Sequence, residues 1–264
     1  METFTCGKYL GQNSEQVTFG GLVVTKSSYK EVPSSDWHQH ENTYLTFILK
    51  GGCKEKRKKL EIDCKPGMML LYPKQETHKN LDYQNNSKNF NIEFNDSWFK
   101  KFDIDTSGFG GQSHINNPLL KCQLINTIGE LQLSDKQTEI NLEATLLATI
   151  SVLAVARNTN DNPEWVKKLF HLLHDETEID WSLSELSCKV NVHPVTISKY
   201  FKINIGDYIR MIKIEKSMPL LSKKSIPLEE VACKSGFVDN AHFTRMFKKH
   251  TGITPSCYRE LVTR

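Results

Sequence analysis

Apolar and polar residues alternate over short runs in the first third of the chain, and turn-forming residues separate these runs. Alternation with a period of two predicts β-strands that are buried on one face. The predicted strands are residues 16–19, 21–25, 44–49, 60–63, 68–72 and 89–94. Short strands at this spacing predict a small all-β barrel or sandwich over about residues 1–95. The cationic run 54–59 is interpreted as a solvated hairpin rather than a nucleic-acid patch, because no aromatic residue interleaves it.

The apolar period changes to that of a helix after about residue 113. Residues 118–133 place an apolar side chain at every third or fourth position, and residues 136–155 are apolar nearly all round. A helix without a polar face must be covered on both sides, either by the β domain or by another subunit, so a homodimer is one hypothesis. The polar, turn-rich stretch 158–163 predicts a linker.

Two copies of a helix pair follow this linker. In the second copy, residues 225–255, Pro227 suits the first helical position, and Gly236 stands where a helix end requires a left-handed residue. Asp239 is a candidate N-cap for a helix from residue 240 to about 249. The side chains of that helix that we expect to point inward are Phe243, Met246 and Phe247.

The first copy lies 46 residues earlier. Ser182 and Glu185 form an S-x-x-E capping box at its start, and a helix over about residues 194–202 follows a turn. Its inward positions match those of the second copy at a constant offset, and they are Ile197, Tyr200 and Phe201. Two divergent copies with the same pattern predict two helix-turn-helix units, joined by a charged amphipathic helix over residues 207–217.

The outward faces of the two copies correspond as well. Small side chains, a hydroxyl and cations on one exposed stripe suit a helix in a DNA major groove, whereas the alternative is a solvated basic helix of a bundle. The stripes consist of Val195, Ser198, Lys199 and Lys202 in the first copy, and of Ala241, Thr244, Arg245 and Lys248 in the second. Lysines are candidates for phosphate contacts, and these are Lys199, Lys202, Lys248 and Lys249.

Charge is distributed unevenly along the chain. Residues 1–160 hold 18 Lys/Arg and 18 Asp/Glu, residues 161–180 hold 2 and 6, and residues 181–264 hold 14 and 7. A basic carboxyl-terminal unit indicates a polyanionic partner for that unit. No apolar run approaches the roughly 18 residues of a membrane span and no signal peptide is recognisable, so we expect a cytoplasmic, nucleoid-associated protein. The seven scattered cysteines favour reduced thiols.

The carboxyl-terminal sequence resembles the AraC family of bacterial transcription regulators. The matching stretches are SLSELS at 182–187, ISKYFK at 197–202, DYIRMIKIEK at 207–216 and EEVACKSGFVDNAHFTRMFKKHTGITPSCYR at 229–259. The resemblance implies two helix-turn-helix units joined by a long helix, with both recognition helices entering successive major grooves on one side of the duplex. It also implies that bases are read by Val195, Ser198 and Lys199 in the first unit and by Asn240, Ala241, Thr244 and Arg245 in the second.

Two features depart from the pattern of that family. Tyr258 follows Phe247 by eleven residues, whereas Tyr208 follows Phe201 by only seven, so the first unit is about four residues short. In addition, Pro219 is expected to end or kink the connecting helix near residue 217. Both features bear on the placement of the recognition helices, and the second unit is the better candidate for sequence-specific contacts.

Histidines are the candidate functional residues of the amino-terminal half. The motif W-H-Q-H at 37–40 puts two imidazoles on one face of a strand, and His78 follows later. With the strand pattern, these residues resemble the cupin-type domain that often precedes an AraC-type unit. Metal-bearing cupins add a Glu four or five residues after this motif, but Tyr44 and Leu45 stand there. A metal site, a small-molecule pocket and purely structural histidines all stay open.

We predict a ligand site without a metal or other cofactor, consisting of Trp37, His38, His40 and His78. The predicted fold is multidomain α+β: a cupin-like β-barrel (about 1–95) with a helical hairpin (about 113–157) in residues 1–157, a linker at 158–163, and an all-α double helix-turn-helix domain in residues 164–264.

The predicted function is that of a sequence-specific transcription regulator, provisionally an activator, and not an enzyme, since the sequence has no GxSxG, HExxH or P-loop motif. Double-stranded DNA is the expected partner. A small-molecule effector, RNA polymerase and a second copy of the chain are further candidate partners, and a membrane is not. The alternative is a cupin-type metalloenzyme with a helical appendage, which predicts a stoichiometric metal and a reaction that is lost on substitution of His38 and His40.

Overall fold

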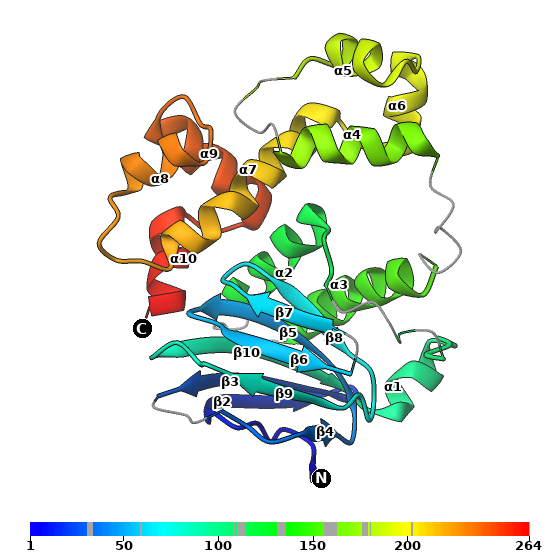
Figure 1. Cartoon of the computed structure of the whole chain (residues 1–264), viewed down its shortest axis with the longest axis vertical. Helices are drawn as coiled ribbons and strands as arrows, with labels where there is room; N and C mark the ends of the chain where they lie inside the picture. The colour runs from blue at the N-terminus through cyan, green and yellow to red at the C-terminus, as the bar shows by residue number, and fades with distance from the viewer. Residues whose placement is uncertain are drawn as a thin grey trace. The chain divides into compact units, whose positions relative to one another are not determined.

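The computed structural model of the chain describes residues 1–30, 34–58, 60–107, 109, 114–130, 136–155, 163–175, 179, 181–201 and 203–263. The chain forms two compact units (Figure 1). The first comprises Met1–Asn116, Leu133–Ala154 and Glu260–Arg264, and the second comprises Asn117–Gln132 and Val155–Arg259.

The first unit is built on two five-stranded sheets, with the strand orders β1-β4-β9-β6-β7 and β2-β3-β10-β5-β8. Their strands are β1 (Glu2–Phe4), β2 (Gln12–Phe19), β3 (Leu22–Tyr29), β4 (His38–His40), β5 (Thr43–Lys50), β6 (Cys53–Arg57), β7 (Leu60–Cys64), β8 (Met69–Tyr72), β9 (His78–Leu81) and β10 (Ser87–Phe94). Strand β10 pairs antiparallel with both β3 and β5. Ile92 and Phe94 of this strand are fully buried, but Asn91 and Glu93 are buried as well, so the strand is covered on both faces and not only on one. The six predicted strands are all present, and the unit is the cupin-like β domain that the sequence predicts.

The cationic run 54–59 lies in the hairpin of β6 and β7, as the sequence suggests, but only one face of that hairpin is solvated. Most of it belongs to β6, which pairs with β7 on one side and β9 on the other. Lys54 is exposed, whereas Glu55 and Arg57 are buried, and the Arg57 Nε donates to the Glu55 Oε1 at 2.7 Å. The Tyr72 hydroxyl donates to the second carboxylate oxygen. Because the inward side chains of β6 are charged and satisfy each other, the strand shows no apolar alternation.

Besides the end of α10, the described part of this unit contains the helices α1 (Asp96–Lys101) and α3 (Lys136–Val155). In α3 one stripe is buried and consists of Leu142, Leu146 and Ile150. The opposite face exposes Ile140, which has 54% of its surface accessible, together with Ala144 and Ala148. The β domain therefore covers only one side of this helix. No helix in the described part of the chain has both the length and the apolar composition needed to span a bilayer.

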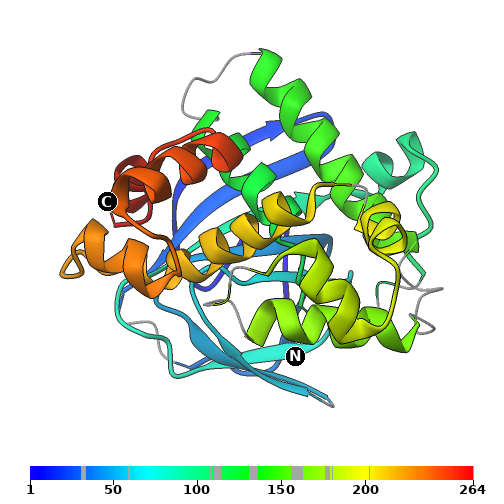
Figure 2. The ribbon, with the colours of Figure 1, turned by 90° about the horizontal axis from the view of Figure 1, so that it is seen from above.

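The second unit is helical. Its helices are α2 (Pro118–Glu130), α4 (Glu164–Asp175), α5 (Leu183–Val190), α6 (Pro194–Phe201), α7 (Ile205–Leu221), α8 (Leu228–Lys234), α9 (Asn240–Thr251) and the part of α10 (Pro255–Thr263) that ends at Arg259. In both ribbon views α7 runs from the α5–α6 pair to the α8–α9 pair (Figures 1 and 2). Leu169 and Leu173 of α4, a helix that the sequence analysis did not predict, share a core with Leu186 and Ile197.

Helix α2 packs against α7 and α9, so its contacts place it in the helical unit. The sequence pattern predicts residues 118–133 in the amino-terminal domain instead. Lys121 of α2 is buried and forms an ion pair with Glu215 of α7. The Asn126 side chain lies against Gly252, which ends α9 with a left-handed φ of 74°. An apolar stripe shows that a helix needs a partner surface, but it does not show which one.

Candidate functional site

The first helix-turn-helix arm consists of α5 and α6. Ser182 caps α5, since its hydroxyl accepts from the Glu185 N–H while the Glu185 carboxylate accepts from the Ser182 N–H at 2.8 Å. Asn191 ends the helix in the left-handed conformation, with φ at 54°. The predicted capping box and turn are thereby confirmed, and they fix the angle at which α6 leaves α5.

The second arm consists of α8 and α9. Helix α8 begins at Leu228, so Pro227 is the residue before the helix and not its first residue. The proline ring suits either position. Gly236 has a φ of 81°, as the sequence requires. Asp239 caps α9 by accepting from the His242 N–H at 2.6 Å. Phe237 packs against Phe243 in the angle between the two helices, with ring centroids 5.1 Å apart.

The inward positions of the two recognition helices correspond, with one exception. Ile197 and its counterpart Phe243 are fully buried, and Phe247 is also fully buried. Tyr200, predicted to point inward, is instead 38% exposed, with its ring against that of Trp165 of α4. A phenol can pack its ring edge on a neighbour while its hydroxyl reaches water, so an aromatic residue at this spacing does not have to be buried.

The outward stripe is present on both recognition helices. In α9, Arg245 and Lys248 are exposed, and neither has a carboxylate partner within the described part of the chain, whereas Thr244 is half-buried. The remaining described members of the stripe are exposed, namely Val195, Ser198, Lys199, Asn240, Ala241 and Lys249. Lys202 lies outside the described residues. Two helices thus present side chains of the same kinds at positions 46 residues apart.

The four-residue difference between the arms lies at the end of the recognition helix. Helix α6 has 8 residues and α9 has 12. In the first arm the next helix begins at the N-cap Asn204, and the Tyr208 N–H donates to its carbonyl at 3.0 Å. In the second arm the Tyr258 N–H donates to the Thr254 carbonyl at 2.9 Å. Both tyrosines are buried. The same junction therefore follows a shorter helix in the first arm.

Pro219 does not end the connecting helix. The prediction of an end near Ser217 is wrong, because α7 continues to Leu221. The proline ring removes one N–H donor, but Ser217, Met218 and Leu221 are all buried on either side of it. Packing of these neighbours compensates for the lost hydrogen bond, which local propensity alone does not foresee.

Asp207, at the start of α7, ties the second recognition helix to the connecting helix. Its Oδ1 accepts from the Lys249 Nζ at 3.0 Å and from the Arg210 Nη2 at 3.0 Å, and the His250 Nε2 lies 3.4 Å away. Burial raises the pKa of Asp207, but the hydrogen bonds and charges of Lys249 and Arg210 outweigh it and bring that pKa below its usual value. Lys249 is consequently held within the unit, whereas Lys248 points to solvent.

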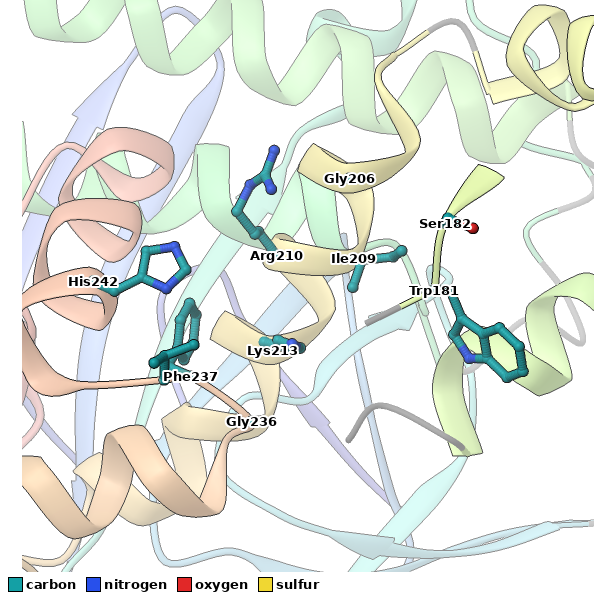
Figure 3. Close-up of a pocket in the computed structure, with 10 residues that line it drawn as sticks. Trp181, Ser182, Gly206, Ile209, Arg210, Lys213, Gly236, Phe237 and His242 are labelled. Atoms are coloured by element: carbon teal, nitrogen blue, oxygen red, sulfur yellow. The ribbon is translucent and has the colours of Figure 1, made fainter. Parts of the chain in front are cut away.

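A hollow of about 240 Å³ lies within the helical unit, between the start of the first arm, the first half of α7 and the turn of the second arm (Figure 3). Its lining includes the cationic side chains of Arg210 and Lys213 and the imidazole of His242. Trp181 also lines it, and its buried Nε1–H finds no acceptor among the described residues. Arg210 is already paired with Asp207 in this hollow, and Lys213 is buried.

Known proteins share this arrangement. A family model described as a helix-turn-helix domain matches residues 189–261. The Msm operon regulatory protein of Streptococcus mutans is 23% identical over 243 residues, which cover 83% of this chain and 84% of that protein. The probable transcription factor PqrA of Proteus vulgaris is 36% identical over 69 residues, which cover 26% of this chain and 57% of that protein. Residues 189–261 are an AraC-type helix-turn-helix domain, and the chain is a DNA-binding transcription regulator.

Among solved structures, this regulator is similar to ToxT from Vibrio cholerae, at 14% identity and a TM-score of 0.40, with 92% of this chain and 100% of that chain covered. A second similar structure is the carboxyl-terminal domain of AraT, a response regulator from Geobacillus stearothermophilus. It is 25% identical, covers 37% of this chain and 85% of that chain, and has a TM-score of 0.34.

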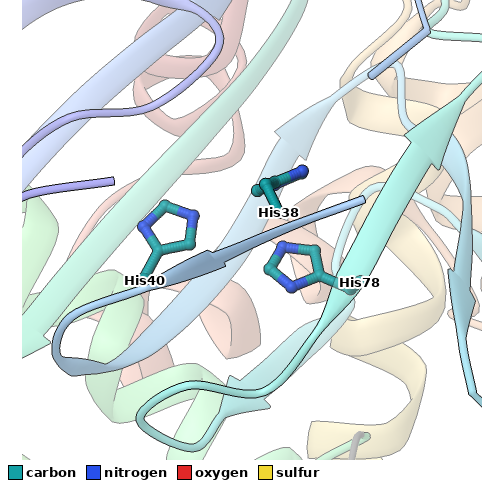
Figure 4. A group of neighbouring side chains, drawn as sticks. All are labelled: His38, His40 and His78. Atoms are coloured by element: carbon teal, nitrogen blue, oxygen red, sulfur yellow. The ribbon is translucent and has the colours of Figure 1, made fainter. Parts of the chain in front are cut away.

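The β domain of this regulator brings three of the four predicted ligand-site residues together. His38 and His40 on β4 and His78 on β9 are buried, with their potential ligand atoms all within 4.8 Å of one another (Figure 4). Burial lowers the pKa of each imidazole, to about 3 for His40, where the neighbouring His38 adds to the effect. Trp37 is instead 39% exposed, and the Lys79 ammonium lies over its ring.

The cavity that these histidines line measures about 30 Å³. A space of this size holds a water molecule or an ion and is about a tenth of the smallest pockets that accept drug-sized ligands. Tyr44, which stands where metal-bearing cupins have their Glu, also lines the cavity, and its hydroxyl lies 3.1 Å from the His78 Nε2. The geometry favours a very small ligand over an organic one.

Proposed function

We propose that this regulator binds one duplex site with both arms, with α6 and α9 lying in successive major grooves. The observation that carries the proposal is the correspondence between the arms. The buried side chains Ile197 and Phe243, and the exposed pairs Ser198/Thr244 and Lys199/Arg245, stand at the same offset of 46 residues. Two helices with the same buried face and the same exposed face are suited to the same kind of surface.

Within this proposal the second arm makes the base-specific contacts. Arg245 has a guanidinium fork that can bind the O6 and N7 atoms of a guanine, and Asn240 and Thr244 flank it on the exposed side. Ala241 permits close approach to the groove. In the first arm Val195, Ser198 and Lys199 take the corresponding places, and the shorter α6 gives that arm the smaller reading surface.

Phosphate contacts come from Lys199 and Lys248, which are exposed, and from the predicted Lys202. These contacts position the protein without specifying sequence. Lys249, which the sequence suggests for the same role, supports the interface indirectly, because its ammonium is engaged by Asp207. The clamp at Asp207 holds α9 at a defined angle to α7.

We also propose that the regulator acts in the cytoplasm as a homodimer, with RNA polymerase as a partner, and that it has no catalytic activity of its own. The exposed side of α3 supports the dimer: Ile140, Ala144 and Ala148 recur every fourth residue and leave a flat apolar stripe. Light scattering during size-exclusion chromatography should give twice the mass of the chain at micromolar concentration. A monomer under those conditions contradicts the dimer.

Selection of bound duplexes from a random pool, followed by footprinting, tests the DNA interface. The proposal predicts a selected site with two protected major-groove segments about 10 base pairs apart on one face of the helix. The segment that contacts α9 should have the higher information content. Protection of a single segment, or a pool without enrichment, contradicts the two-armed interface.

A further inference from the structure

Two cysteines lie opposite each other at the base of the β6–β7 hairpin. Cys53 begins β6 and Cys64 ends β7, and the antiparallel register of the two strands pairs these residues directly. Directly opposite residues of an antiparallel pair present their side chains on the same face of the sheet. Cys64 is buried in a core cluster with Tyr44 and Ile62, and Cys53 packs against that cluster. Both thiols are free, so the fold brings two reactive groups together.

The backbone beside this pair is closely held. Gly52, just before β6, has a left-handed φ of 133°, and a Cβ at this position would lie 1.9 Å from the Cys64 carbonyl oxygen. Only glycine allows the two strands to approach each other in this way. The Gly52 N–H donates to the Ser87 Oγ at 3.0 Å, and the Asn80 side-chain amide donates to the Cys53 Sγ at 3.5 Å. These contacts fix the position of Cys53 relative to Cys64.

The spacing of an antiparallel pair suits a disulfide. Its Cα atoms lie about 4.5–5.5 Å apart, and disulfides join Cα atoms about 4.4–6.8 Å apart. The Cβ atoms of the pair lie about 4.5–5.5 Å apart, whereas a disulfide brings them to about 3.5–4.5 Å. The strands therefore have to move together slightly when the bond forms. A disulfide that holds its strands in this way is more easily reduced than a relaxed one.

We propose that Cys53 and Cys64 are a reversible oxidation site, at which hydrogen peroxide converts the two thiols into a disulfide. The Cys53 sulfur attacks one peroxide oxygen, so that an S–O bond forms and the O–O bond breaks, and the departing oxygen leaves as water with the thiol proton. The Cys64 sulfur then attacks the Cys53 sulfenic acid. The S–S bond forms, the S–O bond breaks, and the departing hydroxide takes the Cys64 proton. Two thiols are oxidised, and one peroxide is reduced to two molecules of water.

The surroundings of the two sulfurs assign these roles. Cys53 is half-buried, whereas only 2% of the Cys64 surface is accessible, so a peroxide reaches Cys53 first. A hydrogen bond with Cys53 and burial raise the pKa of the Cys64 thiol well above its usual value, so Cys64 keeps its proton until the second step. The cross-link fastens β7, the last strand of its sheet, to β6. The inference concerns the β domain alone and does not depend on the DNA interface.

The test uses the full-length reduced chain, treated with hydrogen peroxide at low protein concentration, alkylated and then digested with trypsin. Trypsin cuts at the cationic run 54–59, so the two cysteines fall in separate peptides, residues 51–54 and 60–74. Mass spectrometry should recover these two peptides joined in most chains, and reduced glutathione should restore both thiols. Hydrogen exchange in β7 should slow in the oxidised chain and return to its original rate on reduction.

Cys53→Ser should abolish the joined peptide, and it should fold because Cys53 is only half-buried. Cys6→Ser is the matched control, since it removes an exposed thiol of the same unit and should leave the joined peptide unchanged. Circular dichroism checks the fold of both variants. Oxidised Cys53 without a joined peptide, pairing of Cys53 mainly with another cysteine, or a cross-link that glutathione does not reduce overturns the proposal. If Cys53→Ser does not fold, the peptides of the unchanged chain decide, and absence of the joined pair overturns it equally.

Discussion

The ion pair between Lys121 and Glu215 provides a strong test of the division of the chain into units. The Lys121 side chain is 1% exposed and that of Glu215 is 21% exposed. Changing Glu215 to Gln keeps the shape of the side chain and an oxygen acceptor, but it leaves the Lys121 ammonium buried beside a neutral group. Breaking a buried pair costs about 3–5 kcal/mol. Because Glu215 is partly exposed and Gln still accepts a hydrogen bond, we expect a loss of about 2–4 kcal/mol.

The double variant Lys121→Met with Glu215→Gln is the matched control. It removes both charges, so it should recover most of the lost stability. Hydrogen exchange read by mass spectrometry during urea denaturation assigns the effect to a region. Protection should fall together in α2 and α7, the two helices that the pair joins. A loss below about 1 kcal/mol, or a change confined to the β strands, would refute the assignment of α2 to the helical unit.

Three further predictions concern stability at low pH, DNA binding and thermal stability. In metal-free protein, His40 is neutral when folded, with a pKa near 3, but takes up a proton near pH 6.5 when unfolded. The contribution of His40 is therefore complete above pH 6.5 and falls with decreasing pH, by about 2 kcal/mol at pH 5; urea midpoints should show the loss, and His40→Gln should reduce it but not abolish it, because burial also lowers the pKa of His38 and His78. Asp207→Asn frees Lys249, so α9 is no longer held at a defined angle to α7. The variant should therefore bind the full site more weakly but bind the half-site that α9 contacts as before; equal weakening on both sites in gel-shift titrations would contradict the clamp. Gly252→Ala should destabilise the chain in thermal melts, since an added Cβ would lie 1.7 Å from the Asn126 Oδ1, and an unchanged melting temperature would argue against that contact.

The helical arms could be predicted from sequence because their signals are local. The capping box at Ser182 and Glu185, the turn at Gly236 and the cap at Asp239 each lie within four residues of the backbone groups that they satisfy. The offset between the two copies added independent evidence, since it links Ile197 with Phe243. Local chemistry of this kind is readable without knowledge of the tertiary fold.

Features that depend on distant contacts could not be predicted in the same way. Strand β6 is stable because Glu55 and Arg57 pair inside the sheet, and α7 passes through Pro219 because its flanking side chains are buried. The packing of α2 on α7 and α9 follows from a buried lysine whose partner is 94 residues away. Tyr200 is exposed although its spacing is that of a core residue. In each case tertiary contacts outweigh local preference.

The histidine site lies between these cases. The sequence places His38 and His40 on one face of a strand, but only the pairing of β4 with β9 brings His78 to them. The hydrogen bonds that orient two of the rings come from backbone carbonyls, which carry no sequence signal. Trp37, adjacent in sequence, lies just before β4 and is 39% exposed, so it is not among the buried rings.

The affinity of the Arg245→Ala variant for its selected site and for random duplex DNA is the measurement that tests the central claim most directly. Both affinities are measured at one salt concentration, with Lys248→Ala as the control on the same exposed face. If Arg245 reads a base, Arg245→Ala should lose about 1–3 kcal/mol on the selected site and relax specificity at one base pair. Lys248→Ala should weaken both duplexes alike and reduce the salt slope by about 1. An unchanged ratio of specific to random binding in Arg245→Ala would contradict the account.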